Sequence, residues 1–167
     1  YSLSLDEFRR YAQSGNLIPL YREILADYET PVSAFAKIDH GPSAYLLESV
    51  QGGEKWARYS FLGSGSPILM VEDRGDLLIK EGKRTRRIAC NGAPLDRLRE
   101  FMETYHPVTV PGLPRFVGGA VGYLGYDMVS TFENISVRRK EGLHLPEFAF
   151  LLTDTLLIFD NVAQKIK

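Results

Sequence analysis

The chain has 167 residues, of which 44% are hydrophobic, so it can form the core of a globular domain. Twenty basic and 21 acidic side chains leave a formal charge of -1, which excludes a whole-chain field that would attract nucleic acid or an anionic membrane. No apolar run approaches the roughly 20 residues of a membrane-spanning helix, no signal peptide opens the chain, and one cysteine cannot form an internal disulfide. We therefore expect a cytoplasmic protein that holds its charged ligands locally.

The first 40 residues are predicted to contain two short helices around one strand. Ser4 and Glu7 have the spacing of a capping box, which predicts a helix. Residues 17–25 contain a proline that can open a helix or lie on an edge strand, and we favour the strand. The Thr-Pro pair at 30–31 has the preferences of an N-cap and a first helical position, so it predicts a second helix over residues 31–38.

From residue 44 the pattern changes to short β-rich runs separated by glycine, proline, aspartate and asparagine. The strongest turn signals are Asp-Arg-Gly-Asp at 73–76 and Glu-Gly-Lys at 81–83. This pattern predicts an antiparallel meander. Its runs lie at 44–50, 57–63, 67–73, 76–82 and 83–89.

The second half is predicted to contain one helix and further strands. Residues 94–105 begin with proline and carry apolar side chains at helical spacing. Two long β runs follow at 115–127 and 148–160, and the run at 161–167 also has a strand pattern with an uncovered apolar side, so we expect these residues to be the first part of a longer protein. Strands outnumber helices and do not alternate with them, which predicts an α+β fold of mainly antiparallel sheet with outer helices.

Most residues that could carry chemistry have a simpler structural interpretation. Glycines within 118–125 lack the spacing of a phosphate-binding loop and are interpreted as points of close backbone approach. The histidines have no second ligand type at metal-binding spacing, and no histidine lies near Cys90. Asp154 and Asp160 would lie about 20 Å apart along one strand, too far for an acid/base pair. The basic run at 83–87 is interpreted as a solvated strand edge.

One hairpin combines groups that suit recognition of a free amino acid. The run LLESVQGGEKWARY ends an apolar stretch with Glu48 and Ser49 and returns through Arg58. An amino acid requires an acceptor for its ammonium group and donors for its carboxylate, beside an apolar wall. These three side chains can supply the polar groups, although the residues alone favour a charged hairpin with a cross-strand pair. The flanking apolar residues are Leu46, Leu47 and Trp56.

Four runs, in this order and covering nearly the whole chain, resemble the N-terminal region of anthranilate synthase component I: LIPLYREILADYETPVSAFAKI, YLLESVQGGEKWARYSFLG, FVGGAVGYLGYD and LPEFAFLLTDTLLIFD. The resemblance implies that residues 1–167 are this region, part of a larger two-sheet body, without the C-terminal chorismate-binding catalytic region. It implies an enzyme of tryptophan biosynthesis that converts chorismate and ammonia to anthranilate and pyruvate. It also implies Mg²⁺ and a glutamine amidotransferase partner that supplies the ammonia. No catalytic or metal-binding residue carries over to this chain, which is expected to be inactive alone.

The resemblance further places part of a tryptophan feedback site on the LLES motif. Ser49 matches best, Glu48 and Leu47 follow as its neighbours, and Arg58 is added on physical grounds only. The family completes the pocket with a proline- and methionine-containing segment from the C-terminal half. Two alternatives remain open. One is the aminodeoxychorismate synthase component, which shares the GGAVGYLGYD-like strand but resembles RYSFLG and PVSAF less closely, and the other is a free-standing amino-acid-binding module.

Overall fold

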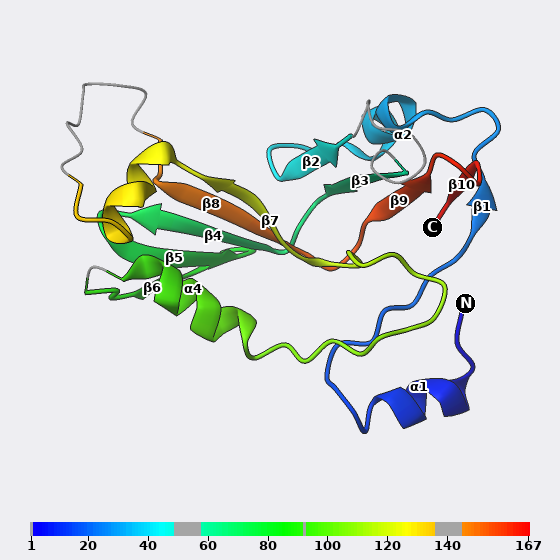
Figure 1. Cartoon of the computed structure of the whole chain (residues 1–167), viewed down its shortest axis with the longest axis horizontal. Helices are drawn as coiled ribbons and strands as arrows, with labels where there is room; N and C mark the ends of the chain where they lie inside the picture. The colour runs from blue at the N-terminus through cyan, green and yellow to red at the C-terminus, as the bar shows by residue number, and fades with distance from the viewer. Residues whose placement is uncertain (1, 49–57, 92, 136–144) are drawn as a thin grey trace. The chain divides into compact units, whose positions relative to one another are not determined.

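The computed structural model describes residues 2–48, 58–91, 93–135 and 145–167. Within these ranges the chain forms two five-stranded antiparallel sheets with a few short helices (Figure 1). The α+β class predicted from the sequence is confirmed. The chain divides into two compact units. Unit 1 comprises Tyr1–Ser66, Tyr105–Gly118 and Asp154–Lys167, and unit 2 comprises Pro67–Thr104 and Gly119–Thr153.

The sheet of unit 1 has the strand order β1-β10-β9-β3-β2, and every neighbouring pair is antiparallel. The central strands β3 and β9 therefore come from segments about 100 positions apart in the sequence. The strands are β1 (Ile24–Leu25), β2 (Ala44–Leu47), β3 (Tyr59–Ser64), β9 (Leu157–Asp160) and β10 (Lys165–Ile166).

Helix α2 (Pro31–Ile38) covers one face of this sheet. It begins after Thr30, whose side chain accepts a hydrogen bond from the backbone N–H of Ser33, so the predicted cap and helix are confirmed. Its buried Ala34 belongs to an apolar core with residues from four strands or adjoining turns. The other buried members of this core are Ala26, Leu62, Phe159 and Ile166.

The opposite face of the unit 1 sheet carries a second apolar row. Leu47 lies across from Phe61, and Phe61 lies across from Ile158, so these side chains share the face that points away from α2. The ring of Phe61 packs edge-to-face against Phe116 with 5.2 Å between ring centroids. Leu47, at the end of β2, remains 48% exposed. An uncovered apolar position therefore ends this row.

The sheet of unit 2 has the order β6-β5-β4-β8-β7. Its first three strands form the predicted meander through the turns at 73–76 and 81–83. Helix α4 (Pro94–Met102) contacts β5, as the apolar spacing of that segment predicts. The strands are β4 (Ile68–Asp73), β5 (Asp76–Glu81), β6 (Arg84–Ile88), β7 (Gly119–Leu124) and β8 (Phe148–Thr153).

Several boundaries differ from the sequence predictions. The meander does not begin at residue 44, because β2 and β3 form a hairpin in unit 1 while β4 to β6 belong to unit 2. The run at 148–160 is two strands, β8 and β9, in different sheets, because pairing with β4 ends at Leu152 and pairing with β3 begins at Leu157. The run at 115–127 contains only β7 and the start of a 3-10 helix, η1 (Tyr126–Thr131).

The N-terminal segment is only partly as predicted. Helix α1 (Leu5–Tyr11) has the capping box of Ser4 and Glu7 but buries none of its residues. Within 17–25, only the two residues of β1 form a strand. Its partner among the described strands is the two-residue β10, so propensity alone was a poor guide to its length.

Candidate functional site

The described part of the amino-acid site lies at one end of the β2–β3 hairpin. Leu47 ends β2, Glu48 follows it with an exposed side chain, and Arg58 precedes β3. Leu46 packs toward the α2 core instead, on the face opposite Leu47. Ser49 and Trp56 lie within 49–57, outside the described residues, so their predicted roles stay predictions.

Arg58 forms an ion pair with Asp160 at the end of β9. Its Nε lies 3.1 Å from Oδ1 and 3.2 Å from Oδ2, and its Nη2 lies 2.7 Å from Oδ2. The arginine side chain is 44% exposed, whereas that of Asp160 is 6% exposed. The cross-strand pair therefore joins β3 to β9 rather than closing the β2–β3 hairpin.

The carboxylate of Asp160 is held on several sides. Oδ1 also accepts hydrogen bonds from the backbone N–H groups of Val162 at 3.2 Å and Ala163 at 3.0 Å. The hydrogen bond from Arg58 is the main reason why the pKa of Asp160 lies below its ordinary value, although burial opposes this. In the same way, Asp160 raises the pKa of the Arg58 guanidinium. Both groups are charged at neutral pH.

Sequence reasoning proposed Arg58 but missed its partner. Asp160 was considered only as half of an acid/base pair with Asp154 on one strand. The structure places Asp154 in the connection between β8 and β9, so that strand does not exist. The available signal was an aspartate at the end of an otherwise apolar strand, LLIFD, where a buried charge requires a partner.

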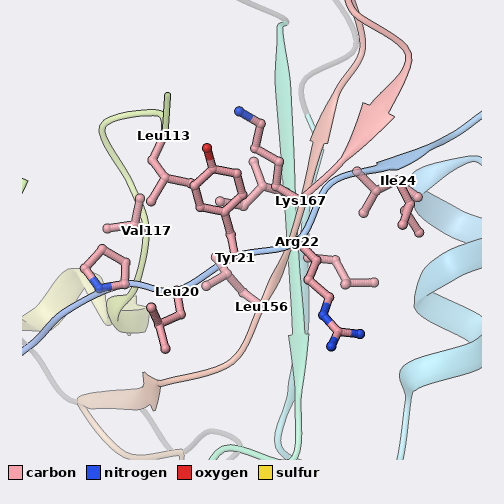
Figure 2. Close-up of a pocket in the computed structure, with 12 residues that line it drawn as sticks. Leu20, Tyr21, Arg22, Ile24, Leu113, Val117, Leu156 and Lys167 are labelled. Atoms are coloured by element: carbon pink, nitrogen blue, oxygen red, sulfur yellow. The ribbon is translucent and has the colours of Figure 1, made fainter. Parts of the chain in front are cut away.

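Unit 1 also has a cavity of about 350 Å³ that sequence reasoning did not anticipate (Figure 2). Its wall is mostly apolar, and Leu113, Val117 and Leu156 contribute to it. The ammonium group of Lys167 contacts the carbonyl of Gly112 and lies 5.1 Å from the ring centroid of Tyr21. Of the predicted site residues that the structure describes, Leu47, Glu48 and Arg58, none lines this cavity.

Other candidate chemical groups among the described residues have structural roles. Burial raises the pKa of the Cys90 thiol, which disfavours the reactive thiolate. His40 and His106 are exposed, and His144 falls outside the described residues. Across the described ranges, no three side chains of the His, Cys, Asp or Glu types come together in a way that could hold a metal ion. Those ranges likewise contain no helix with the length and apolarity to span a membrane.

Known proteins are similar to this chain in sequence and in fold. No protein-family model matches the chain. Over 98% of its length, however, it is 41% identical to "Anthranilate synthase component 1" of Acetivibrio thermocellus and 44% identical to the protein of the same name from Pseudomonas aeruginosa. A crystal structure of anthranilate synthase component I from Streptococcus pneumoniae aligns with 88% of the chain at 27% identity and a TM-score of 0.54.

These matches agree with the α+β class of the fold, and more particularly they show that the chain is similar to anthranilate synthase component I over nearly its whole length. The resemblance seen in the sequence is confirmed. The chain spans 33% and 34% of the two curated relatives and 30% of the crystallised protein, or about a third of each.

Proposed function

We propose that this chain is the N-terminal, tryptophan-binding portion of anthranilate synthase component I, an enzyme that converts chorismate and ammonia to anthranilate and pyruvate. The observation that carries this proposal is the identity of 35% to 44% with proteins of that name over nearly all of the chain. The chain spans about a third of those proteins, so we assign the catalytic activity to the full-length protein and not to this chain alone. The catalytic residues are assigned to the part beyond this chain.

The geometry of unit 1 supports an amino-acid effector site at the end of the β2–β3 hairpin. Leu47 offers an exposed apolar side chain on the same sheet face as Phe61, and Arg58, which precedes β3, offers a partly exposed guanidinium. In this proposal Ser49 and Glu48 bind the polar end of tryptophan and Leu47 contacts its indole. The remaining wall comes from the rest of the protein.

The proposal includes a partner and a metal ion. The word "component" in the names of the relatives implies a second component, which we propose is a glutamine amidotransferase that supplies ammonia. We place the ligands of Mg²⁺ in the rest of the protein, because the resemblance assigns them to the C-terminal chorismate-binding region. No step of the reaction is assigned to residues of this chain.

The proposal is tested by identifying the product of the full-length protein. Incubation with chorismate, Mg²⁺ and ammonium, followed by mass spectrometry, should yield anthranilate and pyruvate. The 167-residue chain alone should yield neither. Accumulation of aminodeoxychorismate would instead favour the folate-pathway relative, and absence of any chorismate turnover by the full-length protein would contradict both assignments.

Replacement of Ser49 by phenylalanine in the full-length protein should relieve inhibition by tryptophan while catalysis persists. Allosteric coupling energies are typically about 1–3 kcal/mol, so loss of the effector contact should raise the tryptophan concentration for half-inhibition by about fivefold or more. The matched control is Ser14→Phe, an exposed position after α1 in the same unit. If Ser49→Phe and Ser14→Phe were equally sensitive to tryptophan, the assignment of the site would be wrong.

A further inference from the structure

Arg58 uses only one edge of its guanidinium group in the observed ion pair. Asp160 faces the edge formed by Nε and Nη2, and every hydrogen bond from Arg58 to another described residue uses these two nitrogens. A guanidinium has a second edge, formed by Nη1 and Nη2, which can hold another carboxylate through two parallel hydrogen bonds. The 44% exposure of the side chain leaves room for this second contact.

Asp160 is well suited to fix the orientation of that second edge. Its carboxylate is buried and is itself held by the backbone N–H groups of Val162 and Ala163. The guanidinium carbon of Arg58 also lies 5.0 Å from the centroid of the Tyr59 ring. An arginine side chain without other contacts loses considerable rotamer freedom when it binds a ligand. The contacts of Arg58 with Asp160 and Tyr59 remove much of that freedom before a ligand binds.

If Arg58 were the sole donor to Asp160, the negative charge of Asp160 would weaken the binding of a second carboxylate to Arg58. Here the two backbone N–H groups stabilise the carboxylate together with Arg58, so the guanidinium is not its only donor. The nearest lysine along the paired strand, Lys165, has Glu23 as its ion-pair partner 2.5 Å away. Of the cations that the structure describes at this strand end, Arg58 is therefore the one best placed for a ligand.

The guanidinium of Arg58 contacts Asp160 and the ring of Tyr59, two residues on a sheet face that also carries an apolar row. Tyr59 lies across from Asp160, and Leu47 lies across from Phe61, so all four residues belong to the face that points away from α2. The rings of Tyr59 and Phe61 have their centroids 6.2 Å apart. A ligand with one carboxylate and an apolar side chain matches this combination of a fixed cation and an adjacent apolar row.

We propose that Asp160 is a positioning residue of the effector site: it orients Arg58 so that the Nη1/Nη2 edge receives the carboxylate of the amino-acid effector. This inference rests on the proposed function and extends it to a residue that lies 102 positions away from Arg58 in the sequence. Asp160 itself does not contact the effector. It acts through the geometry of the arginine.

The experiment compares L-tryptophan with tryptamine, which lacks the carboxylate, as ligands of the full-length protein. Calorimetry gives the ratio of their dissociation constants for wild type, Asp160→Asn, Arg58→Lys and the control Glu23→Gln, which removes an exposed carboxylate of another ion pair in unit 1. We expect wild type and the control to prefer tryptophan, and both test variants to lose about tenfold or more of that preference. Arg58→Lys keeps the positive charge but cannot engage two carboxylates edge-on.

The outcomes separate this inference from the proposed function. If Asp160→Asn kept the wild-type preference for tryptophan, or weakened the two ligands equally, Asp160 would have no positioning role although the tryptophan site would stand, whatever the result for Arg58→Lys. If Asp160→Asn failed to fold, Asp160→Glu, which keeps the carboxylate but displaces it by one methylene, would replace it and should likewise lose the preference for tryptophan. Absence of tryptophan binding by the wild-type protein would overturn both.

Discussion

Asp160 and Arg58 connect β3 to β9, and their contribution to stability should depend on pH. The pKa of Asp160 is lowered in the folded state, chiefly by the hydrogen bond from Arg58. A group with a lowered folded pKa stabilises the fold above its unfolded pKa of about 3.9, and this contribution is lost as the pH falls through the folded value. We expect Asp160→Asn to lower the free energy of unfolding by about 1–3 kcal/mol at pH 7.

Urea denaturation between pH 7 and pH 3 checks this expectation, with Asp154→Asn as the control at an exposed aspartate. The difference between wild type and Asp160→Asn should shrink below about pH 4, since the carboxylate of the unfolded wild-type chain becomes protonated there before that of the folded protein. A difference that grew on acidification would contradict the assigned sign.

Gly122 on β7 permits a close approach of β8, as the glycine pattern of this run predicts. A Cβ atom at this position would lie 1.9 Å from the carbonyl oxygen of Ala149 and 2.7 Å from the Cα of Phe150. These are backbone atoms of a paired strand and cannot move aside without breaking the pairing. We therefore expect Gly122→Ala to lower the free energy of unfolding by about 2–4 kcal/mol in urea denaturation.

The control for this substitution is Gly82→Ala in the β5–β6 turn. Gly82 has a φ of 55°, and nothing lies within 4 Å of the added Cβ. Its cost is therefore limited to about 1–2 kcal/mol for a left-handed conformation. Equal losses for the two variants would mean that backbone approach at Gly122 is not the constraint.

At the residue scale, sequence reasoning identified groups but not long-range partners. Arg58 was selected because it follows a polar hairpin, and Gly122 because it interrupts a strand pattern. The partner of Arg58 lies 102 positions away, and no local spacing rule connects the two residues. The contact exists because β3 and β9 become neighbours in the folded sheet.

At the element scale, the two N-terminal helices have the same type of N-cap but differ in burial. Thr30 caps α2, which buries Ala34 in the unit 1 core, whereas Ser4 caps α1, which buries no residue. Loss of a cap costs about 1 kcal/mol of helix stability. Only α2 must remain folded for the core to persist, so its cap should matter more for global stability.

We expect Thr30→Ala to lower the global free energy of unfolding by about 1 kcal/mol, and Ser4→Ala to lower it by less than about 0.5 kcal/mol. Urea denaturation measures the global change, and amide hydrogen exchange should show faster local opening of α1 in Ser4→Ala. A larger global loss for Ser4→Ala than for Thr30→Ala would show that α1 is coupled to the core.

The helices were predicted more accurately than the sheets, because the residues that start a helix are neighbours in the sequence. Caps are local: Thr30 and Pro31 mark the start of α2 within two residues. Strand alternation, in contrast, is the same whichever sheet a strand joins. The run at 148–160 therefore looked like one strand, although Leu152 pairs with β4 and Leu157 pairs with β3. Sheet membership depends on partners far along the chain, which periodicity does not reveal.

At the scale of the whole molecule, the chain matches about a third of each of its relatives. We propose that the remainder supplies the second wall of the effector site. The described hairpin end supplies exposed Leu47 and the polar groups Glu48 and Arg58. Without a covering segment, the indole of tryptophan would stay largely in water. Burial of an aromatic side chain contributes roughly 1.5–3 kcal/mol, and charge-assisted hydrogen bonds weaken when water surrounds them.

Calorimetric titration of L-tryptophan into the 167-residue chain and into the full-length protein, in the same buffer, tests this account most directly. Loss of the covering wall should weaken binding to the isolated chain by about two orders of magnitude or more relative to the full-length protein. Binding of equal affinity to both would contradict the account, because the whole effector pocket would then lie within these residues.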